Sequence, residues 1–211
     1  MDCLFLPADC PTRLDVETRV YWLPKDEPGR WQPLGECAAG NGAISLILPA
    51  EVCSFFAVTP PTRKARWMQQ ALAYAAEELL AENVDDLHLA LGEALPDGRL
   101  RVVAIRRQLL DDWLGQLREL GLLIVAIHVD ADLLPREGTQ LLFIGERGLL
   151  GGVGETRLAF ASEDWPQLSG LCPAPWHAQG SESEPPLALD DYRQVDDPYA
   201  FLGSQRAAAI N

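Results

Sequence analysis

The chain has 211 residues, of which 48% are hydrophobic, and a formal net charge of −14 at pH 7. This length and composition predict a globular protein with a sizeable core and exclude a chain that is disordered throughout. Its negative surface would repel phosphate backbones, so we expect no nucleic-acid partner and favour a basic protein surface as partner instead.

Membrane-spanning and exported classes are not indicated by the sequence. The longest uncharged apolar run, residues 120–129, is shorter than the roughly 20 residues that a membrane span needs. The N-terminus lacks a basic region followed by a long apolar one, so we expect no signal peptide and a soluble chain as given. The cysteines are odd in number and lack CxxC spacing, which predicts free thiols in a reducing compartment: Cys3, Cys10, Cys37, Cys53 and Cys172.

The first sixty residues predict short strands that end at prolines, because proline cannot donate a backbone N–H to a sheet. We expect these strands over residues 4–6, 20–23, 43–48 and 54–59. A double proline at positions 60 and 61 precedes a predicted helix over residues 63–82, with Thr62 as its cap. Its apolar stripe is predicted from helical spacing: Trp67, Ala71, Tyr74, Ala75 and Leu79.

The middle of the chain predicts a hairpin, a helix and a strand. Leu87, Leu89 and Leu91 alternate with less apolar residues, and a Pro-Asp-Gly turn leads to a second strand over residues 100–106. A helix over residues 108–120 should bury Leu110, Trp113, Leu114 and Leu117. Residues 122–129 predict a buried strand, and we expect a right-handed crossover between the strands on either side of the helix.

The remaining sequence predicts a hairpin of residues 140–144 and 149–153, a strand over residues 156–161, a polar loop over residues 180–186 and a short helix over residues 197–208. The whole pattern predicts a mixed α/β (α+β) fold. We expect an N-terminal lobe over residues 1–95, rich in strands and carrying the 63–82 helix. A second lobe over residues 96–211 would include a strand-rich subdomain at about residues 139–190.

Sequence signatures of catalysis are absent: there is no P-loop, GxGxxG, HExxH, GxSxG or CxxC motif. Asp130 and Asp132 follow the predicted strand 122–129, a position that suits either a metal site or an ordinary strand-exit loop. We interpret His88 and His128 as structural histidines on strands and expect His177 in a loop.

The acidic residues are concentrated near the C-terminus. Residues 163–197 include eight acidic residues and one arginine. This excess of negative charge fits a solvated surface or a docking face for a basic partner. Four of these residues are our candidate partner-binding residues: Asp190, Asp191, Asp196 and Asp197.

Several segments resemble one known family. The stretch from Pro61-Thr62-Arg63-Lys64 to Glu77-Glu78-Leu79-Leu80 and on through Val84 to Gly92 is similar to the cytoplasmic part of the type II secretion system protein L, the GspL family. Residues 121–135 and 142–154 and the final Ala-Ala-Ile-Asn resemble further segments of that family.

This resemblance implies a fold like that of actin-like ATPases, built from ribonuclease-H-like lobes. Nucleotide-binding members carry an Asp-x-Gly phosphate loop after the first strand, but residues 4–10 here read Leu-Phe-Leu-Pro-Ala-Asp-Cys. The resemblance therefore implies that the fold is kept without a functional nucleotide site. It also implies no catalytic residue, no cofactor and no metal.

For function, the resemblance implies a non-catalytic scaffold that recruits the secretion ATPase GspE through the N-terminal domain of that ATPase. GspM and GspF of the inner-membrane platform and a second copy of the chain are further implied partners. The chain would be a cytoplasmic domain at the cytoplasmic face of the bacterial inner membrane, with the transmembrane and periplasmic parts absent from this chain. Two alternatives stay open: an actin-like nucleotide-binding assembly protein, and a metal hydrolase that uses Asp130 and Asp132.

Overall fold

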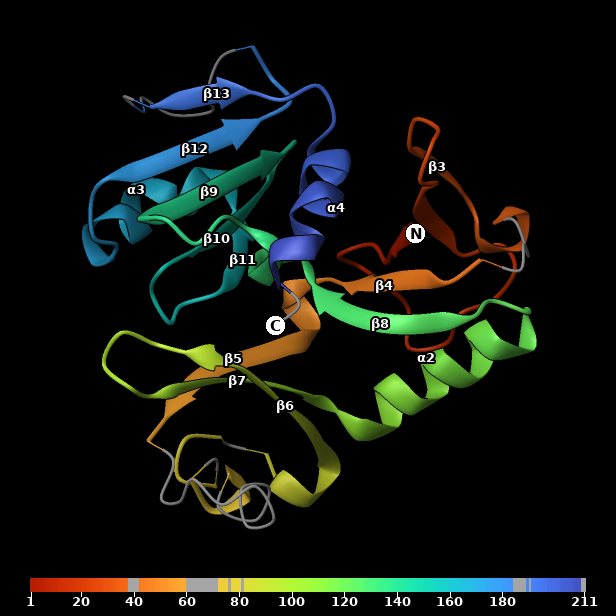
Figure 1. Cartoon of the computed structure of the whole chain (residues 1–211), viewed down its shortest axis with the longest axis horizontal. Coiled ribbons are helices and arrows are strands. Elements are labelled where there is room, and N and C mark those ends of the chain that lie inside the picture. The colour runs from red at the N-terminus through yellow and green to blue at the C-terminus, as the bar shows by residue number, and fades with distance from the viewer. Residues whose placement is uncertain are drawn as a thin grey trace.

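In the part of the chain that this computed structural model describes, three β-sheets form the body of the protein (Figure 1). The structure describes residues 1–37, 42–59, 72–75, 77–80, 82–183, 189 and 191–209, without the side chains of residues 207–209. The N-terminal sheet has the strand order β3-β2-β1-β4-β8, the small sheet β5-β7-β6, and the C-terminal sheet β11-β10-β9-β12-β13.

The strands of the first two sheets are β1 (Asp2–Phe5), β2 (Arg19–Leu23), β3 (Arg30–Pro33), β4 (Ile44–Leu48), β5 (Cys53–Val58), β6 (Leu87–Ala94), β7 (Leu100–Arg106) and β8 (Ile124–Val129). Those of the C-terminal sheet are β9 (Thr139–Ile144), β10 (Arg147–Gly152), β11 (Leu158–Ala161), β12 (Trp176–Gly180) and β13 (Tyr192–Gln194). The α-helices with bounds are α2 (Arg107–Glu119), α3 (Trp165–Leu168) and α4 (Pro198–Ala209). Short 3-10 turns complete the elements: η1 (Leu34–Glu36), η2 (Ala50–Val52), η3 (Val84–Asp86), η4 (Asp130–Leu133), η5 (Ser162–Asp164) and η6 (Ser169–Leu171).

The N-terminal sheet is built around β1, which pairs antiparallel with β2 and parallel with β4. Helix α2 covers this sheet with the apolar side that its sequence predicts. Leu110, Trp113 and Leu117 are buried, since residues three and four apart lie on one side of a helix. Leu114, expected on the same side, is only half-buried. The indole Nε1 of Trp113 also donates to the carbonyl of Pro11 at 3.0 Å, which ties the helix to the β1–β2 loop.

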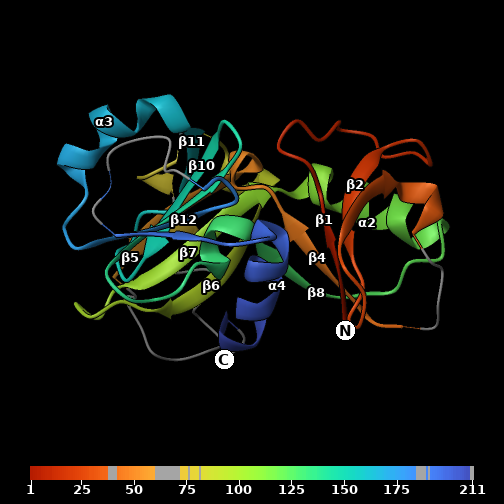
Figure 2. The same ribbon diagram turned by 90° about the horizontal axis from the view of Figure 1, so that it is seen from above.

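Helix α4 lies between the N-terminal and C-terminal sheets, as Figures 1 and 2 both show. Leu202 is completely buried there. Tyr199 stacks on Tyr21 of β2, with ring centroids 4.2 Å apart, and meets Phe5 edge-on. The helix expected over residues 197–208 therefore exists and joins the end of the chain to its first strands.

The C-terminal sheet contains the predicted hairpin, because β9 and β10 pair antiparallel across a two-residue turn. Its other side departs from our expectation. Strand β12 pairs parallel with β9 and β13, so His177 lies in a strand and the loop predicted around it is wrong. Prolines at positions 173 and 175 make this segment resemble a loop, whereas its strand conformation comes from pairing with residues far away in the chain.

Strand β8 corrects two expectations. The predicted strand forms over Ile124–Val129, but it is the outermost strand of the N-terminal sheet and pairs only with β4 among the described strands. The expected burial is wrong, because Val125 and Ile127 are 52% and 39% exposed. The strands before and after α2 also belong to different sheets, so the expected crossover within one sheet does not exist. The run of apolar residues reflects packing on one side of β8 and exposure on the other.

The predicted helix over residues 63–82 lies mostly outside the described residues, including Trp67 and Ala71 of its expected stripe. Residues 72–75 and 77 are helical. Leu72 is buried against Val58 and Val102 of the small sheet, and Ala75 packs beside it. Tyr74 and Leu79, two members of the predicted apolar stripe, are 65% and 56% exposed.

The expected division into lobes at residue 95 stays a prediction. That position falls in the turn between β6 and β7, which are strands of one sheet. Strand β8, from the predicted second lobe, pairs with β4 from the first. In the described part of the chain, no helix is long and apolar enough to cross a membrane.

Candidate functional site

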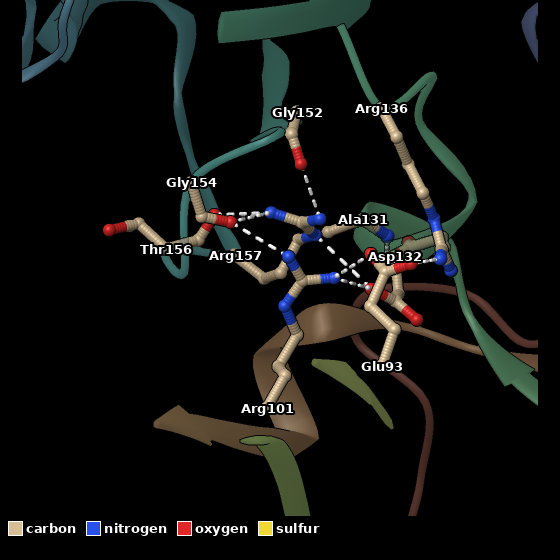
Figure 3. A network of polar contacts seen from close by, with 10 residues as sticks. Glu93, Arg101, Ala131, Asp132, Arg136, Gly152, Gly154, Thr156 and Arg157 are labelled. Carbon is tan, nitrogen blue, oxygen red and sulfur yellow. Dashed lines mark hydrogen bonds and ion pairs between the residues drawn. The ribbon is translucent and has the colours of Figure 1, made fainter. Parts of the chain in front are cut away.

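A network of charged side chains lies where the small sheet meets the C-terminal sheet (Figure 3). Arg101 of β7 places Nη1 3.2 Å from Glu93 Oε1 of β6 and 3.2 Å from Asp132 Oδ1 of η4. Arg157, just before β11, places Nε 3.2 Å from the same Asp132 oxygen, and Arg136 pairs with Glu93. Three arginines therefore share two carboxylates.

Backbone carbonyls complete the network. Arg101 Nη2 and Arg157 Nη1 both donate to the carbonyl of Gly154 at 2.9 Å, and Arg157 Nη2 donates to the carbonyl of Gly152 at 2.6 Å. Figure 3 shows the two guanidinium groups next to each other, both directed toward the Gly154 carbonyl. The network thus links β6 and β7 to η4 and to the β10–β11 turn.

Burial explains why these arginines need so many partners. The side chains of Arg101 and Arg157 are 3% and 0% exposed, and a buried charge is tolerated only when it is paired and hydrogen-bonded. Burial, together with the like charges of Arg101 and Arg136, lowers the pKa of Arg157 to about 10, against the pull of Asp132. The network therefore fixes the junction of the sheets rather than presenting a reactive group.

Asp130, one residue after β8, is held in a second cluster. Its carboxylate accepts the backbone N–H of Ala50 at 3.0 Å and of Ala131 at 2.6 Å, and lies 2.6 Å from Nη2 of Arg147. Arg147 also pairs with Glu51 at 2.6 Å. Burial raises the pKa of Asp130, and the neighbouring Arg147 opposes that rise.

The contacts in these two clusters bear on whether Asp130 and Asp132 could bind a metal ion. Each carboxylate is already paired with a guanidinium, and the residues that the structure describes hold no group of three or more potential metal ligands. The arrangement favours the strand-exit interpretation, because η4 begins directly at the end of β8.

The histidines lie on strands, and each has a different environment. His88 is exposed on β6. His128 of β8 is half-buried, with Nε2 lacking a partner among the described atoms, and burial lowers its pKa. His177 of β12 places Nδ1 2.6 Å from Asp191 Oδ2. Within the described residues, none of the three is paired with a cysteine or serine as an activated nucleophile would require.

The candidate acidic residues are not equivalent. Asp191 and Asp196 are exposed, and Asp190 lies outside the described residues. Asp197 instead caps α4: its Oδ1 accepts the N–H of Tyr199 at 2.9 Å and of Ala200 at 3.1 Å, while Oδ2 accepts the Tyr21 hydroxyl at 2.6 Å. Asp197 thus has a structural role in the cap of α4, so a substitution there would disturb the fold as well as any docking surface.

Sequence reasoning missed the arginines that organise both clusters. Arg101 follows Leu100 and precedes Val102 and Val103 in the apolar part of β7, and it is buried like Val102. A charged residue inside such a strand signals a buried ion pair, because burial of an unpaired charge is too costly. Its partners could not be read from the sequence, since they come from three other elements.

Two solved structures share the fold of this chain. The chain is similar to the cytoplasmic domain of EpsL, an inner-membrane component of the type II secretion system of Vibrio cholerae, with a TM-score of 0.78 and 18% identity over 100% of this chain and 97% of that one. It is also similar to a structure of the PilM–PilN type IV pilus biogenesis complex, with a TM-score of 0.61 and 13% identity over 95% of this chain and 89% of that one. The predicted mixed α/β fold is confirmed, and it is the fold that these two solved structures share with this chain.

Sequence comparison identifies the family. Residues 21–193 match the family described as type II secretion system (T2SS), protein L. The type II secretion system protein L of Pseudomonas aeruginosa is 42% identical over 207 residues, which cover 97% of this chain and 54% of that protein. That of Klebsiella pneumoniae is 32% identical over 139 residues, covering 59% of this chain and 33% of that protein. The chain belongs to the protein L family of the type II secretion system, as its sequence resemblance predicts, and spans about half the length of its Pseudomonas aeruginosa relative.

Proposed function

We propose that this chain is a non-catalytic scaffold of the type II secretion inner-membrane platform that binds the N-terminal domain of the secretion ATPase GspE and couples it to the membrane complex. Its place would be the cytoplasmic face of the bacterial inner membrane. GspM, GspF and a second copy of the chain are the further partners that family membership leads us to propose.

One structural observation supports a scaffold rather than an enzyme. The carboxylates at the junction of the sheets, Glu93, Asp130 and Asp132, are paired with arginines that hold elements together. A catalytic acid or base must be free to exchange a proton with bound substrate, and the ion pairs to arginine oppose that use of these carboxylates. The loop after β1, where an actin-like phosphate loop would lie, carries Pro7 and Pro11 and lacks the Asp-x-Gly sequence.

The charge of the chain supports an electrostatic contribution to partner binding. A net charge of −14 attracts a basic surface over a distance of about one Debye length, so added salt should weaken the complex. The docking face proposed for this contact contains Asp190, Asp191, Asp196 and Asp197. Among these, Asp191 and Asp196 are exposed and can be changed without disturbing the cap of α4.

Calorimetric titration with the N-terminal domain of GspE tests the proposal, with ATP and magnesium titrated separately. We expect stoichiometric binding of the domain and no heat from ATP. The double variant Asp191→Lys/Asp196→Lys should weaken binding by about tenfold or more, or about 1.4 kcal/mol. The matched control, Asp9→Lys/Glu17→Lys, changes the net charge equally at exposed positions of the β1–β2 loop and should retain most of the affinity.

Two results would contradict this proposal. Saturable ATP binding without GspE binding would favour the nucleotide-binding alternative. Equal affinity of the two charge-reversed variants would show that net charge, rather than the Asp191–Asp196 face, governs the contact.

A further inference from the structure

The outer side of β8 is an exposed apolar edge. Leu123, Val125 and Ile127 alternate along this segment and are 57%, 52% and 39% exposed. Residues at alternate positions of a strand lie on the same face, so the three form one stripe. Together with Leu114 of α2 they line a groove between the strand and the helix.

Within the described part of the chain, β8 pairs only with β4, and Figures 1 and 2 both place it at the outside of the N-terminal sheet. Its sequence, Ile-Val-Ala-Ile-His-Val, has none of the lysines or prolines that usually protect an edge strand from pairing. An unpaired apolar edge strand of this kind can form backbone hydrogen bonds with a strand of another chain.

The stripe is complementary to itself. If two copies pair β8 antiparallel about a two-fold axis at Val125, then Leu123 lies opposite the partner's Ile127 and Ile127 opposite the partner's Leu123. Both stripes then face the same side of the joined sheet, where the α2 helices run. Identical patches that match through a two-fold axis are the requirement for a closed homodimer.

The charges on α2 agree with the same axis. Asp111 and Arg118 are both exposed and are seven residues apart, so they lie on one side of the helix with Leu114 between them. Neither takes part in an ion pair among the residues described. In a dimer with a two-fold axis at Val125, the Arg118 end of one α2 would lie toward the partner's Asp111, and two symmetric contacts between opposite charges would follow.

We propose that the outer edge of β8 is the surface through which two copies of this chain associate, with the strands antiparallel and Val125 at the two-fold axis. The inference deepens the proposed self-association by naming its surface and geometry. It makes no use of the proposed GspE contact.

Sedimentation velocity over a range of chain concentrations tests this interface. We expect a reversible monomer–dimer equilibrium that Val125→Glu weakens by about tenfold or more, because the axis places two carboxylates side by side. Val153→Glu is the matched control: Val153 is 46% exposed, outside the stripe, and its substitution should leave the equilibrium unchanged. Arg118→Asp and Asp111→Arg should each weaken the dimer, and their combination should restore it.

Three outcomes would overturn the proposal: a chain that stays monomeric at high concentration, equal effects of Val125→Glu and Val153→Glu, or a charge-swapped double variant no better than either single variant. Titration of Val125→Glu with the N-terminal domain of GspE separates the two proposals. Retained GspE binding with lost dimerisation supports the β8 interface, whereas lost GspE binding by a chain that never dimerises would assign the stripe to GspE instead.

Discussion

At the scale of single residues, burial decides how His128 responds to pH. Burial lowers its pKa, the charge of Arg206 acts in the same direction, and Asp132 opposes them. The folded-state pKa is therefore below the unfolded value of about 6.5, which means that folding favours the neutral ring. This contribution to stability is complete above pH 6.5 and is lost as the pH falls through the folded-state pKa.

The substitution His128→Gln tests this argument, because glutamine cannot be protonated in this range. Urea unfolding measured from pH 8 to pH 5 should show a steeper loss of stability toward low pH for the original chain than for the variant. The difference at pH 8, where the imidazole is neutral, provides the baseline for the substitution itself. Parallel pH profiles would mean that His128 titrates in the folded protein as it does in the unfolded chain.

At the scale of elements, the start of α4 depends on Asp197. Its carboxylate accepts two N–H groups of the first turn and the Tyr21 hydroxyl, so Asp197→Ala should cost about 1–2 kcal/mol in the free energy of unfolding. Tyr21→Phe removes only the hydroxyl contact and should cost less. Asp196→Ala, at the exposed neighbouring position, should change stability by under about 0.5 kcal/mol in the same urea titrations. A cost for Asp196→Ala as large as that for Asp197→Ala would refute the capping role.

Local patterns predicted most of these elements for a physical reason. Helical spacing placed Leu110, Trp113 and Leu117 on the buried side of α2, and a Pro-Asp-Gly turn placed the β6–β7 hairpin, where Gly98 has a φ of +84° that suits glycine. Strand β12 could not be predicted in this way, because its conformation depends on pairing with β9, more than thirty residues away. The run of apolar residues in β8 likewise does not distinguish a buried strand from an edge strand.

At the scale of the whole molecule, sequence similarity identified the family, but the way the sheets are joined was not predictable. The pair Asp130 and Asp132 was singled out from its position after a strand, whereas the arginines that neutralise it come from β7, β10 and the segment before β11. These contacts join residues far apart in the chain, and no local spacing encodes them. The sequence therefore identified the two carboxylates of the candidate site but not the ion pairs that they form.

This joining of sheets leads to a prediction for Asp132→Asn. The variant removes a negative charge shared by Arg101 and Arg157, two buried cations, while leaving the volume nearly unchanged. Because Asp132 itself is 30% exposed and water can enter in part, we expect a loss of about 2–3 kcal/mol, somewhat less than for a fully buried pair. The control is Glu155→Gln, which breaks an exposed pair with Arg99 and should cost under about 1 kcal/mol.

Hydrogen exchange of Asp132→Asn should rise in η4 and in the β10–β11 turn before it rises in β1 and β4. Uniformly faster exchange would instead show that the network stabilises the fold as a whole and does not specifically hold the sheets together.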